Sequence, residues 1–230
     1  MQTEEGLWRL SPSGLYTFTE CKSCFWLDNH HGRGPHFPLV LNTAMDTILK
    51  HRYDAYRANR TFPTEAQELL KEGIRPYTDL AQLDKWRGDY KALTVTDEEV
   101  GYILRGKIDD VLVERDDCLI PADYKASGGP PSDDKQKYYR DQLAAYGFMF
   151  KHHGHPVSDR AYLFHYYPVD KTDPGVSVTF AGKVDKVDIG AVEIEQKFKD
   201  IVALLNGSYP GDNPECEQCS FVLARVAAKS

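Results

Sequence analysis

Charged residues in the middle of the chain have the types and spacing of a hydrolytic metal centre. The segment "PADYKAS" carries Asp123 and Lys125 two positions apart, which places both side chains on one face if the segment is a strand. The preceding segment "GKIDDVLV" adds Asp109 and Asp110. Two carboxylates roughly 4 to 6 Å apart bind a hard cation such as Mg²⁺ or Mn²⁺. A neighbouring ammonium can then orient a water molecule or stabilise charge on a phosphate.

The pairing of the two segments decides which aspartate completes this centre. If Val113 lies opposite Leu119 in an antiparallel hairpin, Asp109 lies opposite Asp123. A slip of one residue places Asp110 there instead. The spacing of the residues leaves both registers open.

Four of the five cysteines form two Cys-x-x-Cys pairs, one near each end of the chain. They are Cys21 with Cys24 and Cys216 with Cys219, whereas Cys118 stands alone. A redox site needs only one such pair, so two pairs favour a four-thiolate metal site that ties the ends of the chain together. The spacing alone suits tetrahedral Zn²⁺ at least as well as an iron–sulfur cluster.

An α/β core must position these groups, because helical and strand periodicities alternate along the chain. The patterns predict helices over 11–27, 38–57, 64–93 (broken at Gly73 and Pro76), 132–154 and 190–207, and β-rich segments over 101–115, 118–127, 160–169 and 176–182. We expect one domain over 1–230, with a helical N-terminal part (1–99), a catalytic α/β core (100–205) and a C-terminal cysteine segment (206–230).

The composition indicates a globular protein rather than a membrane protein or a protein with a general polyanion-binding surface. A chain of 230 residues that is 41% hydrophobic can bury one sizeable core. It contains no apolar run long enough to span a membrane and no signal-peptide pattern at its start, so we expect a cytoplasmic protein. The net charge of -7 argues against a general polyanion-binding surface and leaves room only for a local basic groove.

The order of these motifs resembles the PD-(D/E)XK nuclease superfamily in its RecB-like branch, whose restriction-endonuclease-like core is a mixed sheet flanked by helices. "GKID" followed by "DYK" is similar to the core signature of that family. The resemblance implies that Asp109, Asp123 and Lys125 are the metal and catalytic residues, which selects Asp109 over Asp110. It also implies the carbonyl of Tyr124 as a further metal ligand.

Two further segments extend the resemblance. "DQLAAYG" is similar to the family's Gln-x-x-x-Tyr motif, which implies that Gln142 and Tyr146 face the active site. Many relatives take another metal ligand from the helix before the hairpin, where Asp46 suits an oxygen-rich site better than His51.

The terminal cysteines are similar to the four-cysteine [4Fe-4S] site of AddB-like and CRISPR-associated Cas-four-type exonucleases. The resemblance therefore implies an iron–sulfur cluster, with structural Zn²⁺ as the alternative. Those relatives have one N-terminal and three C-terminal cysteines, whereas this chain has two and two.

The resemblance implies a Mg²⁺- or Mn²⁺-dependent deoxyribonuclease, an exonuclease acting on single-stranded DNA or overhangs. Its setting would be DNA repair, recombination or CRISPR adaptation, with a helicase or an adaptation protein as partner. The alternative is a catalytically silent nuclease-fold subunit that binds DNA or acts as a scaffold. The expected DNA contacts are aromatic and basic residues of the helix after the hairpin: Lys135, Lys137, Tyr138, Tyr139, Arg140 and Tyr146.

Overall fold

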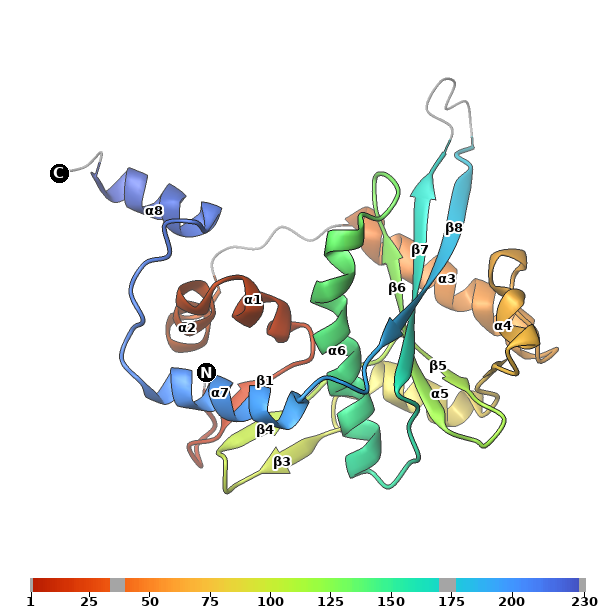
Figure 1. Cartoon of the computed structure of the whole chain (residues 1–230), viewed down its shortest axis with the longest axis horizontal. Coiled ribbons are helices and arrows are strands. Elements are labelled where there is room, and N and C mark those ends of the chain that lie inside the picture. Colours follow the sequence, from red (N-terminus) through yellow and green to blue (C-terminus); the bar gives the residue numbers. More distant parts are fainter. Residues whose placement is uncertain (1, 34–39, 170–176, 228–230) are drawn as a thin grey trace.

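A computed structural model describes residues 2–33, 40–169 and 177–227, without the side chains of 133–137 and 225–227 (Figure 1). The helices are α1 (Gly14–Glu20), α2 (Lys22–His31), α3 (Val40–Arg57), α4 (Glu68–Lys71), α5 (Leu80–Gly88), α6 (Asp133–His152), α7 (Ile194–Asn206) and α8 (Glu217–Ala227), with a 3-10 turn at Thr64–Ala66. The strands are β1 (Trp8–Leu10), β2 (Arg75–Pro76), β3 (Val95–Asp97), β4 (Tyr102–Leu104), β5 (Asp110–Val113), β6 (Leu119–Ala126), β7 (Arg160–Pro168) and β8 (Phe180–Asp188).

The main sheet has five strands in the order β2-β5-β6-β7-β8. Only β6 and β7 are parallel to each other, and the other neighbours are antiparallel. Parallel neighbours need a long crossover connection, which α6 supplies between β6 and β7. A second, three-stranded sheet has the order β1-β4-β3.

Helices cover both faces of the main sheet, with α6 and α3 on opposite sides (Figure 1). Because strand side chains alternate between faces, β7 sends Tyr162, Phe164 and Tyr166 toward Leu49 and Tyr53 of α3. Its other side chains, Ala161 and Leu163, join the cluster that contains α6. A strand buried on both faces is apolar almost throughout, as β7 is.

The predicted fold class is confirmed: a mixed sheet flanked by helices, with the four cysteines gathered near one another. The helical N-terminal part also contributes β1, β2 and β3. No helix in the described ranges has both the length and the apolar character needed to cross a bilayer.

Four local expectations differ from the structure. In the helical region predicted over 64–93, strand β2 separates α4 from α5, which ends at Gly88. The helix over 11–27 is two helices, because Cys21 has an extended backbone (φ -154, ψ 110) and caps α2 through a hydrogen bond from Cys24 N to its sulfur. The β-rich segment 101–115 divides into β4 and β5, which belong to different sheets. The strand predicted over 176–182 begins at Phe180 and continues to Asp188, and residue 176 lies outside the described residues.

Gly106 is closely packed in the segment 105–109 that separates β4 from β5. A Cβ atom there would lie 2.9 Å from the ring of Pro12 and 3.0 Å from the ring of Tyr146. The glycine of "GKID" therefore lets the chain pass between the N-terminal segment and α6 before it enters β5.

Candidate active site and cysteine cluster

The hairpin β5-β6 brings Asp109 level with Asp123. The strands pair with Val113 opposite Leu119 and Asp110 opposite Ala122, so the residue before β5 faces Asp123. The Asp109 carboxylate also accepts a hydrogen bond from the backbone N–H of Tyr124 at 3.2 Å. Of the two registers left open by spacing, the structure has the one that selects Asp109.

Asp123 is a buried carboxylate whose two oxygens have different surroundings. Its Oδ1 accepts a hydrogen bond from Gln142 Nε2 at 3.0 Å. Its Oδ2 lies 2.6 Å from Lys125 Nζ and forms an ion pair with it. The angles of this contact are not those of a hydrogen bond. Burial raises the pKa of Asp123 to about 7, with Asp109 adding to the rise and Lys125 opposing it. A hard divalent cation would satisfy this buried oxygen and its carboxylate neighbour, so the residues fit such an ion.

Lys125 lies on the same face of β6 as Asp123. Burial alone would lower the pKa of Lys125, but Asp123 and Asp109 together raise it above its ordinary value. Its ammonium is also 4.5 Å from the centre of the Tyr139 ring. The two carboxylates therefore stabilise the charged form of the Lys125 ammonium beside them.

Helix α6 presents both residues of the Gln-x-x-x-Tyr motif to this centre. Gln142 bonds Asp123, and the hydroxyl of Tyr146 donates to the carbonyl of Lys107 at 2.5 Å. Because Tyr146 is only 4% exposed, its ring has no free face for a nucleic-acid base. Its structural contact is with the loop that leads into Asp109, so the expected stacking role for Tyr146 is not supported.

The side chain of Tyr124 points to the opposite face of the sheet, where its hydroxyl donates to Asp110. Only the main chain of Tyr124 is then left to face the carboxylate pair, consistent with the expectation of a carbonyl ligand. The Asp110 carboxylate also pairs with Arg57 at 2.5 Å and with Arg87 at 3.5 Å. Arg87 in turn donates to the carbonyl of Asp109 at 2.7 Å. This network therefore holds the backbone that carries Asp109.

Lys50 of α3 is a residue of the centre that no motif indicated. Its ammonium lies 2.9 Å from Asp109 Oδ1 and 2.8 Å from Asp46 Oδ2. The one available signal was the i,i+4 spacing of Asp46 and Lys50, which favours an ion pair on a helix. Asp46 is thus connected to Asp109 through the ammonium of Lys50, which contacts both carboxylates. His51, on the same helix, is exposed.

The polar face continues across two more strands of the sheet. In the strand register, Lys125 lies opposite His165 of β7, and His165 lies opposite Lys183 of β8. The three side chains therefore form a row across the sheet. Buried His165 lies 3.4 Å from Asp185, and Lys183 lies 2.9 Å from the same carboxylate. The sequence indicated none of these residues, because their strands read as ordinary core strands.

Most of the residues expected to contact DNA lie in the first half of α6. Tyr138 packs edge-to-face against Tyr16, with ring centres 5.0 Å apart, and Tyr16 is 48% exposed. Partly buried Arg140 donates to the carbonyl of Asp188. The side chains of Lys135 and Lys137 lie outside the described residues.

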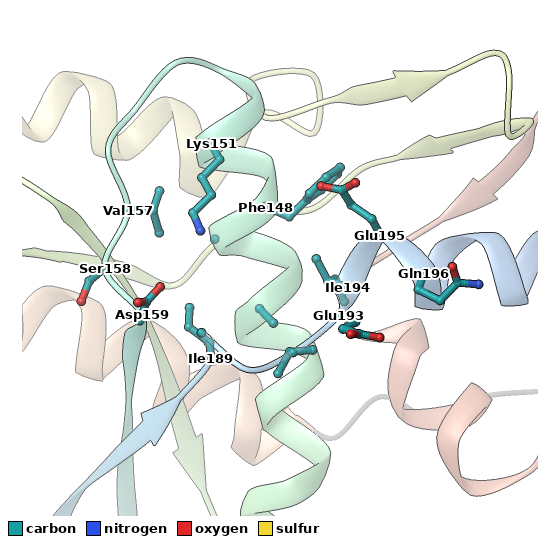
Figure 2. A pocket seen from close by; sticks show the side chains of 14 residues that line it. Phe148, Lys151, Val157, Ser158, Asp159, Ile189, Glu193, Ile194, Glu195 and Gln196 are labelled. Carbon is teal, nitrogen blue, oxygen red and sulfur yellow. The ribbon is translucent and has the colours of Figure 1, made fainter.

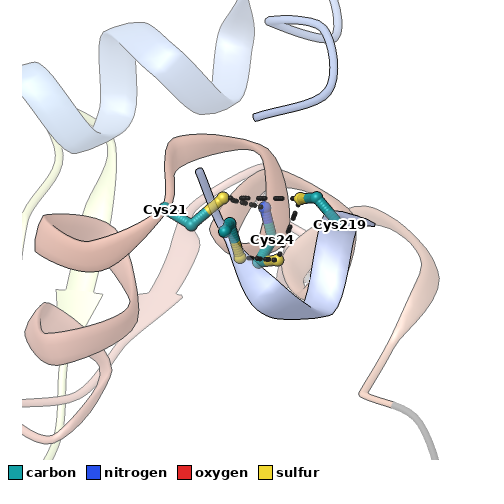
Figure 3. Close-up of side chains that lie close together, drawn as sticks. Cys21, Cys24 and Cys219 are labelled. Carbon is teal, nitrogen blue, oxygen red and sulfur yellow. Dashed lines mark hydrogen bonds between the residues drawn. The ribbon is translucent and has the colours of Figure 1, made fainter. Parts of the chain in front are cut away.

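The four paired cysteines meet where α2 and α8 come together (Figure 3). The sulfur of Cys219 lies 3.6 Å from that of Cys21 and 3.5 Å from that of Cys24, and Cys24 lies 3.7 Å from Cys216. Burial opposes ionisation of Cys21, but hydrogen bonds from its neighbours lower its pKa to about 7. Within the described part of the chain, this is the only group of three or more potential metal ligands so close together.

A pocket between the second half of α6 and the start of α7 is separate from both centres (Figure 2). Its lining includes Phe148, Lys151, Ile189 and Glu195 and none of the carboxylate pair, Lys125 or the cysteines.

A mixed sheet with paired carboxylates and a lysine on one hairpin, next to a helix glutamine, defines a nuclease-type fold. The chain belongs to the PD-(D/E)XK nuclease superfamily, whose family model matches residues 9–222. Members of this superfamily are generally nucleases and usually use divalent metal ions.

No curated protein matches the chain. A solved structure titled "Crystal structure of SSO0001" is similar at 15% sequence identity and a TM-score of 0.32, over 90% of this chain and 95% of that chain.

Proposed function

We propose that the protein is a RecB-like, divalent-metal-dependent deoxyribonuclease that hydrolyses phosphodiester bonds of single-stranded DNA or overhangs as an exonuclease. The supporting observation is the buried Asp123, which lies level with Asp109 and 2.6 Å from Lys125. The setting we propose is cytoplasmic DNA repair, recombination or CRISPR adaptation, with a helicase or adaptation protein as partner.

Asp109 and Asp123 would hold Mg²⁺ or Mn²⁺, with Asp46 and the Tyr124 carbonyl as further oxygen ligands. When bound, such an ion polarises the scissile phosphate and lowers the pKa of a water molecule. Gln142 keeps the Asp123 carboxylate in one orientation through its hydrogen bond. Lys125 offsets the negative charge that grows on the phosphate during hydrolysis.

Two residues bind backbone carbonyls at or just before Asp109. Tyr146 holds the carbonyl of Lys107, two residues before Asp109. Arg87 holds the carbonyl of Asp109 itself. Such positioning matters because small displacements of a catalytic group reduce rates strongly.

Exposed aromatic residues near the centre support a single-stranded substrate. Tyr90 is 57% exposed, and Lys107 lies 4.2 Å from the centre of its ring. The exposed Tyr16 and its neighbour Tyr138 lie near the first half of α6. Aromatic rings beside basic groups stack unpaired bases while the basic groups contact phosphates. Such local pairs are compatible with a net charge of -7.

For the cysteine cluster we propose a structural metal that joins α2 to α8. A single tetrahedral ion with metal–sulfur bonds of about 2.3 Å separates its sulfurs by roughly 3.8 Å. Three sulfur–sulfur contacts are 3.5–3.7 Å, and all four sulfurs lie within 4.8 Å of one another. A [4Fe-4S] cluster binds each thiolate through a different iron atom, so it would need the sulfurs farther apart. The geometry therefore favours Zn²⁺, and the cluster implied by the family resemblance becomes the alternative.

The test of the nuclease is degradation of end-labelled single- and double-stranded DNA with Mn²⁺ or Mg²⁺. We expect Asp123→Asn and Lys125→Met to lose roughly 10²-fold or more of the activity. Lys71→Met is the matched control, because Lys71 forms only an exposed ion pair with Glu68. Equal degradation by all preparations would trace the activity to a contaminant. DNA binding without hydrolysis would favour the silent scaffold subunit.

A further inference from the structure

Lys50 occupies the position between two carboxylates that a metal ion would be expected to take. Its ammonium is 2.9 Å from Asp109 and 2.8 Å from Asp46. The three side chains are partly buried, with exposed fractions of 24% for Lys50, 21% for Asp109 and 38% for Asp46. Partial burial strengthens this pairing compared with one in open water.

Each carboxylate of the proposed metal pair therefore has its own lysine. Asp123 has Lys125, from the same strand, and Asp109 has Lys50, from α3. The role proposed for Lys125 is at the phosphate, which leaves Lys50 without a function. Two adjacent carboxylates repel each other unless a cation neutralises them, and Lys50 supplies that cation from within the chain.

We infer that Lys50 is a resident counter-ion that a divalent metal must displace from Asp109, and that it thereby sets the metal concentration at which the centre loads. The inference rests on the proposed metal-dependent function. An ammonium and a divalent cation cannot share one carboxylate oxygen without strong repulsion. The other oxygen of Asp109 already accepts the backbone N–H of Tyr124, so Lys50 must leave the oxygen that it holds when the ion enters.

Asp46 makes this displacement feasible. It lies one helical turn before Lys50, so the ammonium can keep that partner after it has left Asp109. Lysine also suits such a movement, because its ammonium is a point charge on a flexible stem. In this arrangement Asp46 acts first on Lys50 and joins the metal only if Lys50 releases it too.

The experiment is a Mn²⁺ titration followed by the electron paramagnetic resonance signal of the free ion, which needs no hydrolysis. For Lys50→Met we expect a Kd for Mn²⁺ on the order of tenfold lower than for the wild type, or about 1.4 kcal/mol. Lys50→Arg should stay within about threefold of the wild type, because it keeps the charge. Lys71→Met should not differ from the wild type.

A second neutral variant and a second measurement check the result independently. Lys50→Gln is a second neutral variant that can still hydrogen-bond the carboxylates, and it should also bind Mn²⁺ more tightly. Thermal unfolding should show a larger stabilisation by Mn²⁺ in the neutral variants than in the wild type. Unchanged or weaker Mn²⁺ binding by folded Lys50→Met and Lys50→Gln would overturn the inference.

The outcome is separable from that of the nuclease assay. If the wild type hydrolyses DNA and its Mn²⁺ binding depends on Asp109, equal affinity in the Lys50 variants overturns only the role of Lys50. If no preparation hydrolyses DNA, the proposed function fails, while tighter Mn²⁺ binding by Lys50→Met still supports the counter-ion.

Discussion

Asp109 and Asp110 are neighbours in the chain, yet their carboxylates serve opposite faces of the main sheet. The Asp109 carboxylate pairs with Lys50 and accepts the N–H of Tyr124 beside the proposed metal centre. The Asp110 carboxylate is fully buried on the other side with Arg57 and Arg87. The Asp109 carboxylate is thus available for chemistry, whereas the Asp110 carboxylate stabilises the fold around it.

This division predicts opposite phenotypes for two adjacent substitutions. Asp110→Asn should lower the free energy of unfolding by about 3 kcal/mol or more, because it leaves the buried Arg57 with an incomplete set of partners. Asp109→Asn should change stability by less than about 1 kcal/mol but abolish metal-dependent hydrolysis. Urea unfolding and the DNA assay measure the two effects. Equal loss of stability in both variants would contradict the division.

Metal binding should depend on pH near neutrality. Because burial raises the pKa of Asp123 to about 7, its carboxyl is largely protonated at pH 6 and ionised at pH 8 in the metal-free protein. Mn²⁺ affinity should therefore rise across this range and binding should release protons, which calorimetry in buffers of different ionisation enthalpy detects. Asp123→Asn removes the titrating group. A wild-type affinity that stays flat between pH 6 and 8 would argue against the raised pKa.

Tyr146→Phe should affect both stability and rate. It removes the hydrogen bond from the tyrosine hydroxyl to the partly buried carbonyl of Lys107, which costs about 1 kcal/mol. Because this bond fixes the loop that leads into Asp109, we expect kcat to fall about tenfold with little change in KM. The partly buried Tyr139 does not make this bond, so Tyr139→Phe is the control. A loss confined to KM would instead indicate that Tyr146 contacts the substrate.

Removal of the metal proposed for the cysteine cluster should loosen the helices at the junction while the main sheet stays folded. Cys216→Ser or treatment with a chelator should increase amide exchange in α2 and α8, whose junction is formed by the thiols. Cys118→Ser, a change outside the cluster, should leave exchange there unaltered. Stoichiometric zinc in a colourless protein would support a single tetrahedral ion. A brown protein with iron, purified without oxygen, would overturn that assignment.

Much of the fold follows from periodicity and turn positions. The observed register of β5 with β6 is one of the two that the sequence allowed. The long periodic patterns predicted in the sequence correspond to the elements α3, α6, β7 and α7. The short strands β1 and β3 were not indicated, because three residues carry too little periodicity. Helix α8 was not expected either, since the C-terminal segment was interpreted only through its cysteines.

The residues of the candidate site also divide into those that the sequence indicated and those that only the structure reveals. Asp109, Asp123, Lys125 and Gln142 lie within segments that resemble motifs of the family, and the structure brings these four together. Lys50 is missing from the motifs because its contact with Asp109 joins a helix to a distant strand. Local sequence cannot indicate which lysine of an amphipathic helix will reach a particular carboxylate. The partners of Asp110, Arg57 and Arg87, were hidden for the same reason.

The cysteine junction also has a mechanical consequence. Cys21 and Cys219 are 198 positions apart in the chain, yet their sulfurs are in contact. When the thiolates share one metal, a pulling force applied outside them passes through the metal–sulfur bonds and bypasses the sheet between them. The proposed catalytic hairpin is then shielded from tension applied on either flank, until the junction itself breaks.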